Sequence, residues 1–174
     1  MENSETSNLV DNSGIMKVEI NKISLDKFIL LSVITFGLYG LWWIYKSWRF
    51  FQDKDKSEIM PAMRALFSIF FLIPLFNKIL KLANSSGYKQ KYISTLLFIG
   101  YIIWNLLAEL PEPYFLIAIF SFVFLVPPFK ALNFAVDYCD GFKVNEQKTY
   151  NGRQIFLLII GGIFWILVLI GLFK

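Results

Sequence analysis

The chain has 174 residues, of which 56% are hydrophobic and only 17% are charged, and its net charge is +4. A soluble domain carries about 25% charged residues, so this composition disfavours a soluble globular protein. The single cysteine, Cys139, excludes an intrachain disulfide, and the absence of histidine removes the commonest general base and metal ligand.

Residues 1–24 are predicted to form a flexible N-terminal tail. Its first part, MENSETSNLVDNSGI, is polar and has too few apolar side chains to order itself. The next stretch, KVEINKIS, alternates weakly between apolar and polar residues, which fits either a short extended piece or a linker. The remaining residues, 25–174, are predicted to form a single helical domain.

Four uncharged apolar runs predict membrane-spanning helices. Each run has 17 to 20 residues between charged residues. A helix of that length reaches roughly 26 to 30 Å, which matches the hydrocarbon core of a bilayer. The last run is the most apolar, with fifteen Leu, Ile, Val or Phe residues. The expected spans cover residues 28–46, 92–109, 113–130 and 154–173.

A fifth apolar run, ALFSIFFLIPLFN, has only 13 residues and contains Pro74. A run of this length is typical of a re-entrant or interfacial segment, which we expect over residues 62–83. Near its end, Lys78 and Lys81 share one helical face opposite an apolar face, as in an amphipathic helix lying among lipid headgroups. A crossing by residues 65–77 stays open as the alternative, because flanking cations can snorkel to the membrane surface.

The positions of the cations favour four spans over five. In the four-span arrangement, 13 of the 17 cations fall in segments 46–64, 78–91 and 130–153 on one side. The positive-inside rule makes that side cytoplasmic, and both chain ends then face away from the cytoplasm. The expected fold is therefore all-α: a polytopic transmembrane helical bundle with four spans plus one re-entrant or interfacial helical segment.

The stretch TFGLYGLWWIYKSWRFF, residues 35–51, combines glycines, aromatic residues and cations. Trp and Tyr side chains prefer the membrane–water boundary, where neighbouring cations reach lipid phosphates. We therefore predict a collar of cations that contacts anionic lipid. The candidate lipid-headgroup contacts are Lys46, Arg49, Lys78 and Lys81.

Helix packing inside the bilayer favours small residues, which allow close approach, and polar side chains, which bond between helices. Asn105 is the one strongly polar side chain deep in a predicted span, and we expect its amide to bond to another helix. The candidate helix-packing residues are Gly37, Gly40, Asn105, Gly161 and Gly162.

Little in the sequence indicates catalysis. It has no metal-spaced cluster, no glycine-rich phosphate loop and no nucleophile elbow, and no predicted span carries a central charged residue. We predict an integral membrane protein that is not an enzyme and uses no cofactor or metal. It would act through the lipid bilayer, anionic lipids, a second copy or another membrane protein, and not through nucleic acid. An oligomeric channel or small transporter subunit is the alternative. A membrane enzyme acting on lipids would need clustered carboxylates or histidines at the boundary.

One resemblance rests on VITFGLYGLWWIYKSWRFF, in which a Thr-x-Gly-x-Tyr run precedes Trp, Tyr and a basic exit. This stretch resembles the first span of a family of small, uncharacterised bacterial multi-span membrane proteins, a domain of unknown function. The pieces PAMRALFSIFFLIPLF, LPEPYFL and GGIFWILVLIGLF are similar to later parts of that family. The resemblance implies a multi-pass protein of the bacterial inner membrane, and it implies no activity.

Overall fold

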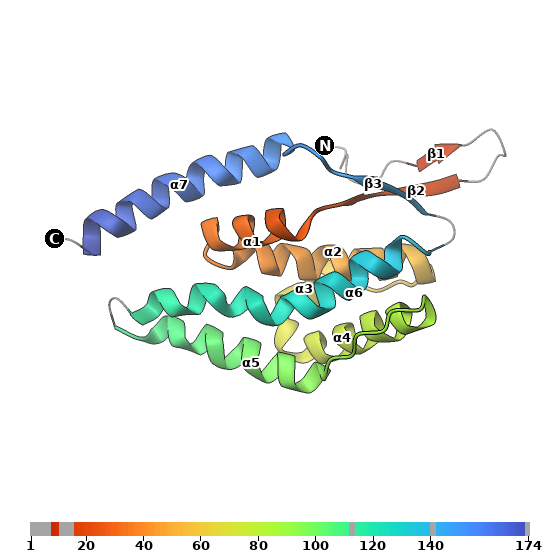
Figure 1. Cartoon of the computed structure of the whole chain (residues 1–174), viewed down its shortest axis with the longest axis horizontal. Coiled ribbons are helices and arrows are strands. Elements are labelled where there is room, and N and C mark those ends of the chain that lie inside the picture. The colour runs from red at the N-terminus through yellow and green to blue at the C-terminus, as the bar shows by residue number, and fades with distance from the viewer. Residues whose placement is uncertain (1–7, 11–15, 112–113, 140–141, 173–174) are drawn as a thin grey trace.

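A computed structural model describes residues 8–10, 16–111, 114–139 and 142–172. These residues are mostly helical, as predicted, but a three-stranded sheet corrects the all-α expectation (Figure 1). The strands are β1 (Asn8–Val10), β2 (Met16–Lys22) and β3 (Phe142–Glu146). The helices are α1 (Leu25–Ile34), α2 (Leu38–Asp55), α3 (Pro61–Leu66), α4 (Ser68–Ser85), α5 (Ser94–Leu106), η1 (Leu107–Glu109), η2 (Tyr114–Leu125), α6 (Val126–Val136) and α7 (Gly152–Leu172).

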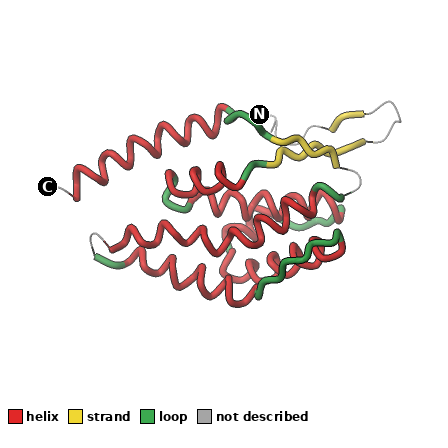
Figure 2. The backbone as a smooth tube through the Cα atoms, viewed as in Figure 1, coloured by secondary structure: helices red, strands yellow, loops and turns green. Residues whose placement is uncertain are grey.

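The helices stack in layers that run along the long axis of the molecule. In Figure 1, α7 lies at the top, the α1–α2 pair below it, then η2 with α6, and α5 with α4 at the bottom. Contacts between neighbouring layers follow this order, with α1 touching α7, η2 and α6, and α5 and α4 touching η2 and α6 respectively. The strands lie together at one end of the stack (Figure 2).

The first predicted span, residues 28–46, is wrong as a continuous helix. Helix α1 ends at Ile34, the chain reverses over residues 35–37, and α2 runs back alongside it (Figure 1). The rings of Phe28 and Trp43 are 6.0 Å apart, whereas fifteen residues of one straight helix would separate them by about 22 Å. This run is therefore a helical hairpin, and the start of α1 and the end of α2 lie toward the same end of the molecule.

Three of the predicted helical segments match described helices. Residues 92–109 correspond to α5 with η1, and residues 154–173 correspond to α7. Residues 113–130 correspond to η2, a 3₁₀ helix, which continues into α6 as far as Val136. Pro127 and Pro128 lie in the first turn of α6, where a missing N–H does no harm. Gly152–Leu172 and Tyr114–Val136 are each long and apolar enough to cross a membrane, and Ser94–Glu109 is shorter.

The expected re-entrant or interfacial segment, residues 62–83, consists of two helices, α3 and α4, with a break at Phe67. The elbow is apolar and exposed, since Leu66 and Phe70 keep 69% and 72% of their surface. Further along α4, Leu75 and Ile79 are fully buried, whereas Lys81 is exposed. The amphipathic pattern is thus present, and α4 uses its apolar side to pack into the bundle.

The sheet joins the two ends of the sequence. Strand β2 pairs with β1 antiparallel and with β3 parallel, so that Asn21 lies opposite Asn145. Lys22 donates to Asp137 at 2.7 Å, and Lys143 donates to Glu19 at 3.1 Å. The predicted tail, residues 1–24, is described only in part, and that part contains β1 and β2. The four-span arrangement placed residues 16–22 and 142–146 on opposite sides of a membrane, which this pairing makes wrong.

Candidate functional site

The reversal between α1 and α2 is built from residues 35–37. Phe36 and Gly37 have φ angles of 53° and 86°, a left-handed conformation that suits glycine and turns the chain sharply. The Thr35 hydroxyl donates to the carbonyl of Leu31 at 2.7 Å and accepts from the N–H of Tyr39 at 2.9 Å. A single side chain thus satisfies the end of one helix and the start of the next.

Every backbone N–H from residue 35 to residue 40 has an acceptor within the hairpin. The acceptors are, in order, the carbonyls of Leu31, Val33, Ser32 and Thr35, the Thr35 hydroxyl and the carbonyl of Gly37. Backbone outside a regular helix is tolerated away from water only when its polar groups are satisfied in this way. The turn is therefore suited to an apolar environment.

Helix α7 packs against this turn. An ideal Cβ on Gly161 would lie 2.3 Å from Ile34 Cγ2 and 2.6 Å from the Ile34 carbonyl oxygen, so only glycine allows this approach. The Trp165 indole donates to the carbonyl of Val33 at 3.2 Å, and its ring stacks on Phe36 at 4.8 Å. Two cavities lie beside this contact, between α7 and the α1–α2 hairpin.

The two adjoining cavities form one groove between α2 and α7 and share Tyr39, Trp42 and Leu157. The cavity nearer the turn has about 460 Å³ and an almost wholly apolar lining. The cavity nearer the start of α7 has about 400 Å³ and a lining that includes Lys46 and Arg153. Both volumes fall within the range of about 300–1,000 Å³ that is usual for ligand pockets.

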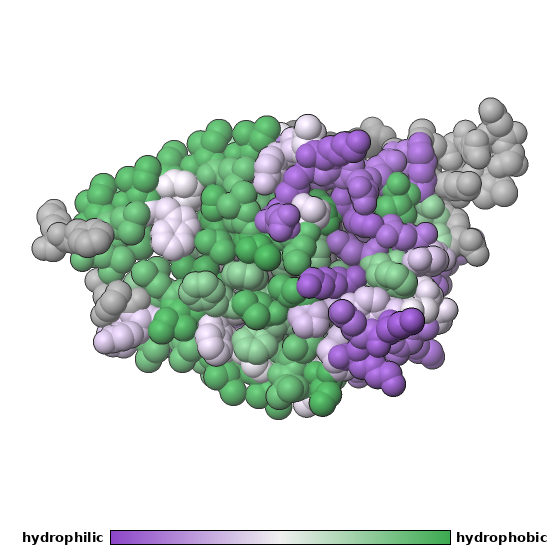
Figure 3. Space-filling view, viewed as in Figure 1, coloured by the Kyte–Doolittle hydropathy of each residue, from purple (hydrophilic) through white to green (hydrophobic). Residues whose placement is uncertain are grey.

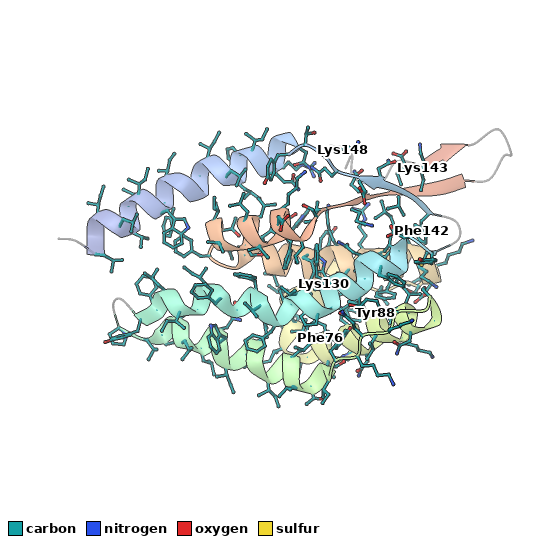
Figure 4. The ribbon with its side chains drawn as sticks, viewed as in Figure 1. Phe76, Tyr88, Lys130, Phe142, Lys143 and Lys148 are labelled. Atoms are coloured by element: carbon teal, nitrogen blue, oxygen red, sulfur yellow. The ribbon has the colours of Figure 1, made fainter. Side chains whose placement is uncertain are left out.

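The polar mouth of the groove is formed where α7 begins. The Gln154 N–H donates to the Asn151 side chain at 2.9 Å, and the Asn151 N–H donates to the Gln154 side chain at 3.1 Å. This reciprocal pair caps the helix and fixes its first turn beside Lys46. Figure 4 shows Lys143 and Lys148 near the same end of the molecule.

The structure separates the predicted packing residues into different roles. Gly37 forms the turn, whereas Gly40 approaches Leu125, whose Cδ1 would lie 2.8 Å from an added Cβ. Gly161 makes the tight contact with α1, but nothing lies within 4 Å of a Cβ on the adjacent Gly162. The Asn105 amide donates to the carbonyl of Tyr101 on its own helix at 2.8 Å. This bond lies within α5, and the expected bond from Asn105 to another helix stays a prediction.

The four cations predicted to contact lipid headgroups also have different surroundings in the structure. Lys46 lies over the Trp42 ring, at 5.9 Å from its centroid, and lines the groove. Lys78 pairs with Asp55 at 2.5 Å, so it links α4 to α2, and Lys81 is exposed.

The remaining contact, Arg49, interacts electrostatically with Asp53 one turn along α2. Burial raises the pKa of the Asp53 carboxyl, and the positive charge of Arg49 partly opposes that rise. Arg49 therefore stabilises the charged carboxylate of a residue on its own helix. Among the four cations, Lys46 lines the groove between α2 and α7, and Lys46 and Arg49 both line a smaller cavity beside β2.

Two residues that shape this region are not among the candidate residues predicted from the sequence. The first is Thr35, whose double hydrogen bond and neighbouring Phe-Gly pair break an otherwise uninterrupted apolar run. The second is Arg153, which lies 107 positions after Lys46 and so gives no local signal. Within the described ranges, no group of three or more Cys, Asp or Glu residues could hold a metal ion.

Comparison with known proteins gives one match. A family model, described as Domain of unknown function (DUF4234), matches residues 23–174. No curated protein matches the chain significantly. No solved structure matches it either.

Proposed function

Since the chain belongs to the DUF4234 family, a domain of unknown function, we propose that it is a multi-pass protein of the bacterial inner membrane without catalytic activity. In this proposal it acts through lipid or protein partners. Three segments cross the bilayer, namely α5 with η1, η2 with the start of α6, and α7. The α1–α2 hairpin enters the bilayer from the cytoplasmic side and returns.

The exposed apolar surface of α7 carries this proposal. Among the described residues of α7, only Gln154 and Gly161 are buried. Large apolar side chains along its whole length stay half exposed, among them Phe156 at 62%, Ile163 at 55% and Ile170 at 59%. A core helix of a soluble protein would bury one face, and twenty-one residues reach about 31 Å, enough to span a bilayer.

The surface divides along the long axis in the way that a membrane protein requires. On the face shown in Figure 3, apolar residues cover most of the left part and hydrophilic residues gather toward the sheet. No Lys or Arg falls between residues 92 and 129, the stretch that makes the first two proposed crossings. In the proposed arrangement, 16 of the 17 cations therefore lie on the side of the sheet. If the sheet end is cytoplasmic, this distribution agrees with the positive-inside rule more fully than the four-span arrangement did.

The pairing of β2 with β3 supports an even number of crossings between residues 22 and 142. Helix α5 with η1 and the antiparallel η2 supply two crossings, joined at the far end of the molecule (Figure 1). The α1–α2 hairpin supplies none, and the satisfied backbone of its turn fits a position within the hydrocarbon. Helix α7 then makes the third crossing.

The ion pairs at the polar end and the apolar cavities between α2 and α7 support a role without catalysis. There Lys22 pairs with Asp137 within the fold, and the two adjoining cavities between α2 and α7 are mostly apolar. Such surfaces suit lipids and other membrane helices. The alternative, an oligomeric channel or transporter subunit, would need a polar path, and no described feature favours it.

Cysteine labelling tests this topology. In a Cys139→Ser background, single cysteines at Ser86 and Asn145 are expected to resist an impermeant thiol reagent in intact cells, because both lie at the cationic end. A cysteine at Leu110, which joins η1 to η2 at the opposite end and is 41% exposed, should be labelled. Permeabilised cells provide the control, in which all three positions react. Labelling of Ser86 or Asn145 from outside would contradict the proposed orientation.

A further inference from the structure

We propose that the groove between α2 and α7 binds one anionic phospholipid, with its phosphate beside Lys46 and Arg153 and an acyl chain along the apolar part. This inference rests on the proposed membrane location. It assigns a ligand to the two adjoining cavities and a specific role to two of the many cations at the polar end.

The groove has the depth of one leaflet. It runs along α7 from Arg153 at the polar mouth to Phe164 beside the α1–α2 turn. Eleven residues of helix cover about 17 Å, close to half of a hydrocarbon core of about 30 Å. A lipid lying in the groove would therefore have its headgroup at the boundary and its chain in the hydrocarbon.

The charge at the mouth selects an anion. Lys46 from α2 and Arg153 from α7 line the same cavity, and none of the described residues lining either cavity is acidic. The start of a twenty-one-residue helix adds the positive end of its dipole, which favours phosphate. An added Cβ at Gly152 would meet nothing within 4 Å, so space exists beside the first turn.

The apolar part of the groove suits an acyl chain better than a peptide. Its lining includes Leu38, Ile160 and Phe164, with exposed fractions of 70%, 47% and 51%, so the groove opens sideways to the bilayer. An acyl chain needs no hydrogen-bond partners, whereas an extended peptide in the same place would leave backbone amides unsatisfied. The Trp42 ring, 39% exposed, borders both cavities at the level where indole rings prefer to lie.

Lipid binding to the purified chain in detergent tests the proposal, with dioleoyl phosphatidylglycerol and dioleoyl phosphatidylcholine added separately and followed by native mass spectrometry. Wild-type protein should bind one phosphatidylglycerol in preference to phosphatidylcholine. The Lys46→Gln, Arg153→Gln variant should bind phosphatidylglycerol roughly 10- to 30-fold more weakly, since it loses two cations near the phosphate. The matched control is Lys89→Gln, Lys91→Gln, which removes the same charge from exposed residues outside the groove and should bind normally.

A second pair of variants tests the acyl part independently of charge. Ile160→Trp fills the groove and should weaken binding of phosphatidylglycerol, whereas Ile166→Trp, on the same helix but outside the groove lining and 59% exposed, should not. Thermal unfolding of all variants checks that the fold is kept. Equal binding by the Lys46, Arg153 variant and its control, or equal binding of the two lipids by wild type, would overturn the proposal. The protein would still extract as an integral membrane protein in that case, so the proposed function would stand.

Discussion

Replacing Phe28 by alanine is expected to lower the free energy of unfolding by about 3–5 kcal/mol, the usual range for truncating a fully buried phenylalanine. Phe28 has no exposed surface. Its ring stacks on Phe129 with centroids 4.4 Å apart, and its centroid lies 6.2 Å from the tilted ring of Tyr39 and 6.0 Å from Trp43 in an edge-on pair. It thus joins α1, α2 and α6, and an alanine would leave a cavity where the hairpin meets the rest of the bundle.

Equilibrium unfolding in detergent, followed by circular dichroism, provides the measurement. Phe70→Ala is the matched control, because the same atoms are removed from a side chain that is 72% exposed at the α3–α4 elbow. That variant should unfold like the wild type to within about 0.5 kcal/mol. A Phe28→Ala protein as stable as the control would mean that α1 does not fold back on α2.

The second large effect is expected at Gly161, where alanine should destabilise the protein by about 1–3 kcal/mol, as overpacking does. The added methyl group would overlap the Ile34 carbonyl oxygen, which belongs to the backbone and cannot rotate away. Helix α7 would have to move off the hairpin, loosening the indole–carbonyl bond between Trp165 and Val33.

Substitution of the neighbouring Gly162 is the matched control, because a Cβ added there meets nothing within 4 Å. Gly162→Ala should be neutral or stabilising by up to about 1 kcal/mol, because alanine restricts the unfolded chain more than glycine does. Gly161→Ala should therefore be less stable than Gly162→Ala by at least about 1 kcal/mol when unfolding is measured under the same conditions. Equal effects would contradict the packing of α7 on the end of α1.

Helix α7 and the helical character of residues 94–109 and 114–130 follow from the sequence, because long uncharged apolar runs indicate helices directly. The hairpin could not be predicted in the same way. Its apolar run has the length of a span, and what breaks it is the three-residue combination of Thr35, Phe36 and Gly37. The sequence predicts Gly37 as a helix-packing residue, whereas its positive φ gives it a part in the turn.

The sheet was missed for a related reason. Strand β2 is stabilised by β3, which lies about 120 residues away, and the weak alternation of KVEINKIS alone does not distinguish a strand from a linker. Among the candidate residues, Lys46 was correctly placed on a helix near aromatic side chains, but its partner across the groove, Arg153, depends on how α7 returns to α2. Long-range pairing of this kind carries no local signal.

Disulfide trapping between β2 and β3 tests the central claim, that the first apolar run folds back and leaves the N-terminal strand beside residues 142–146. Asn21 and Asn145 are partners in the parallel register, and adjacent strands lie about 4.8 Å apart, within the range a disulfide can bridge. A protein with cysteines at these two positions and Cys139→Ser, oxidised in native membranes, should form an intramolecular disulfide. Cyanogen bromide then cleaves after Met60 and Met63, between the two positions, so the fragments should stay joined until reduced. Fragments that separate without reduction, as in the single-cysteine controls, would contradict the fold and restore a first segment that crosses the membrane.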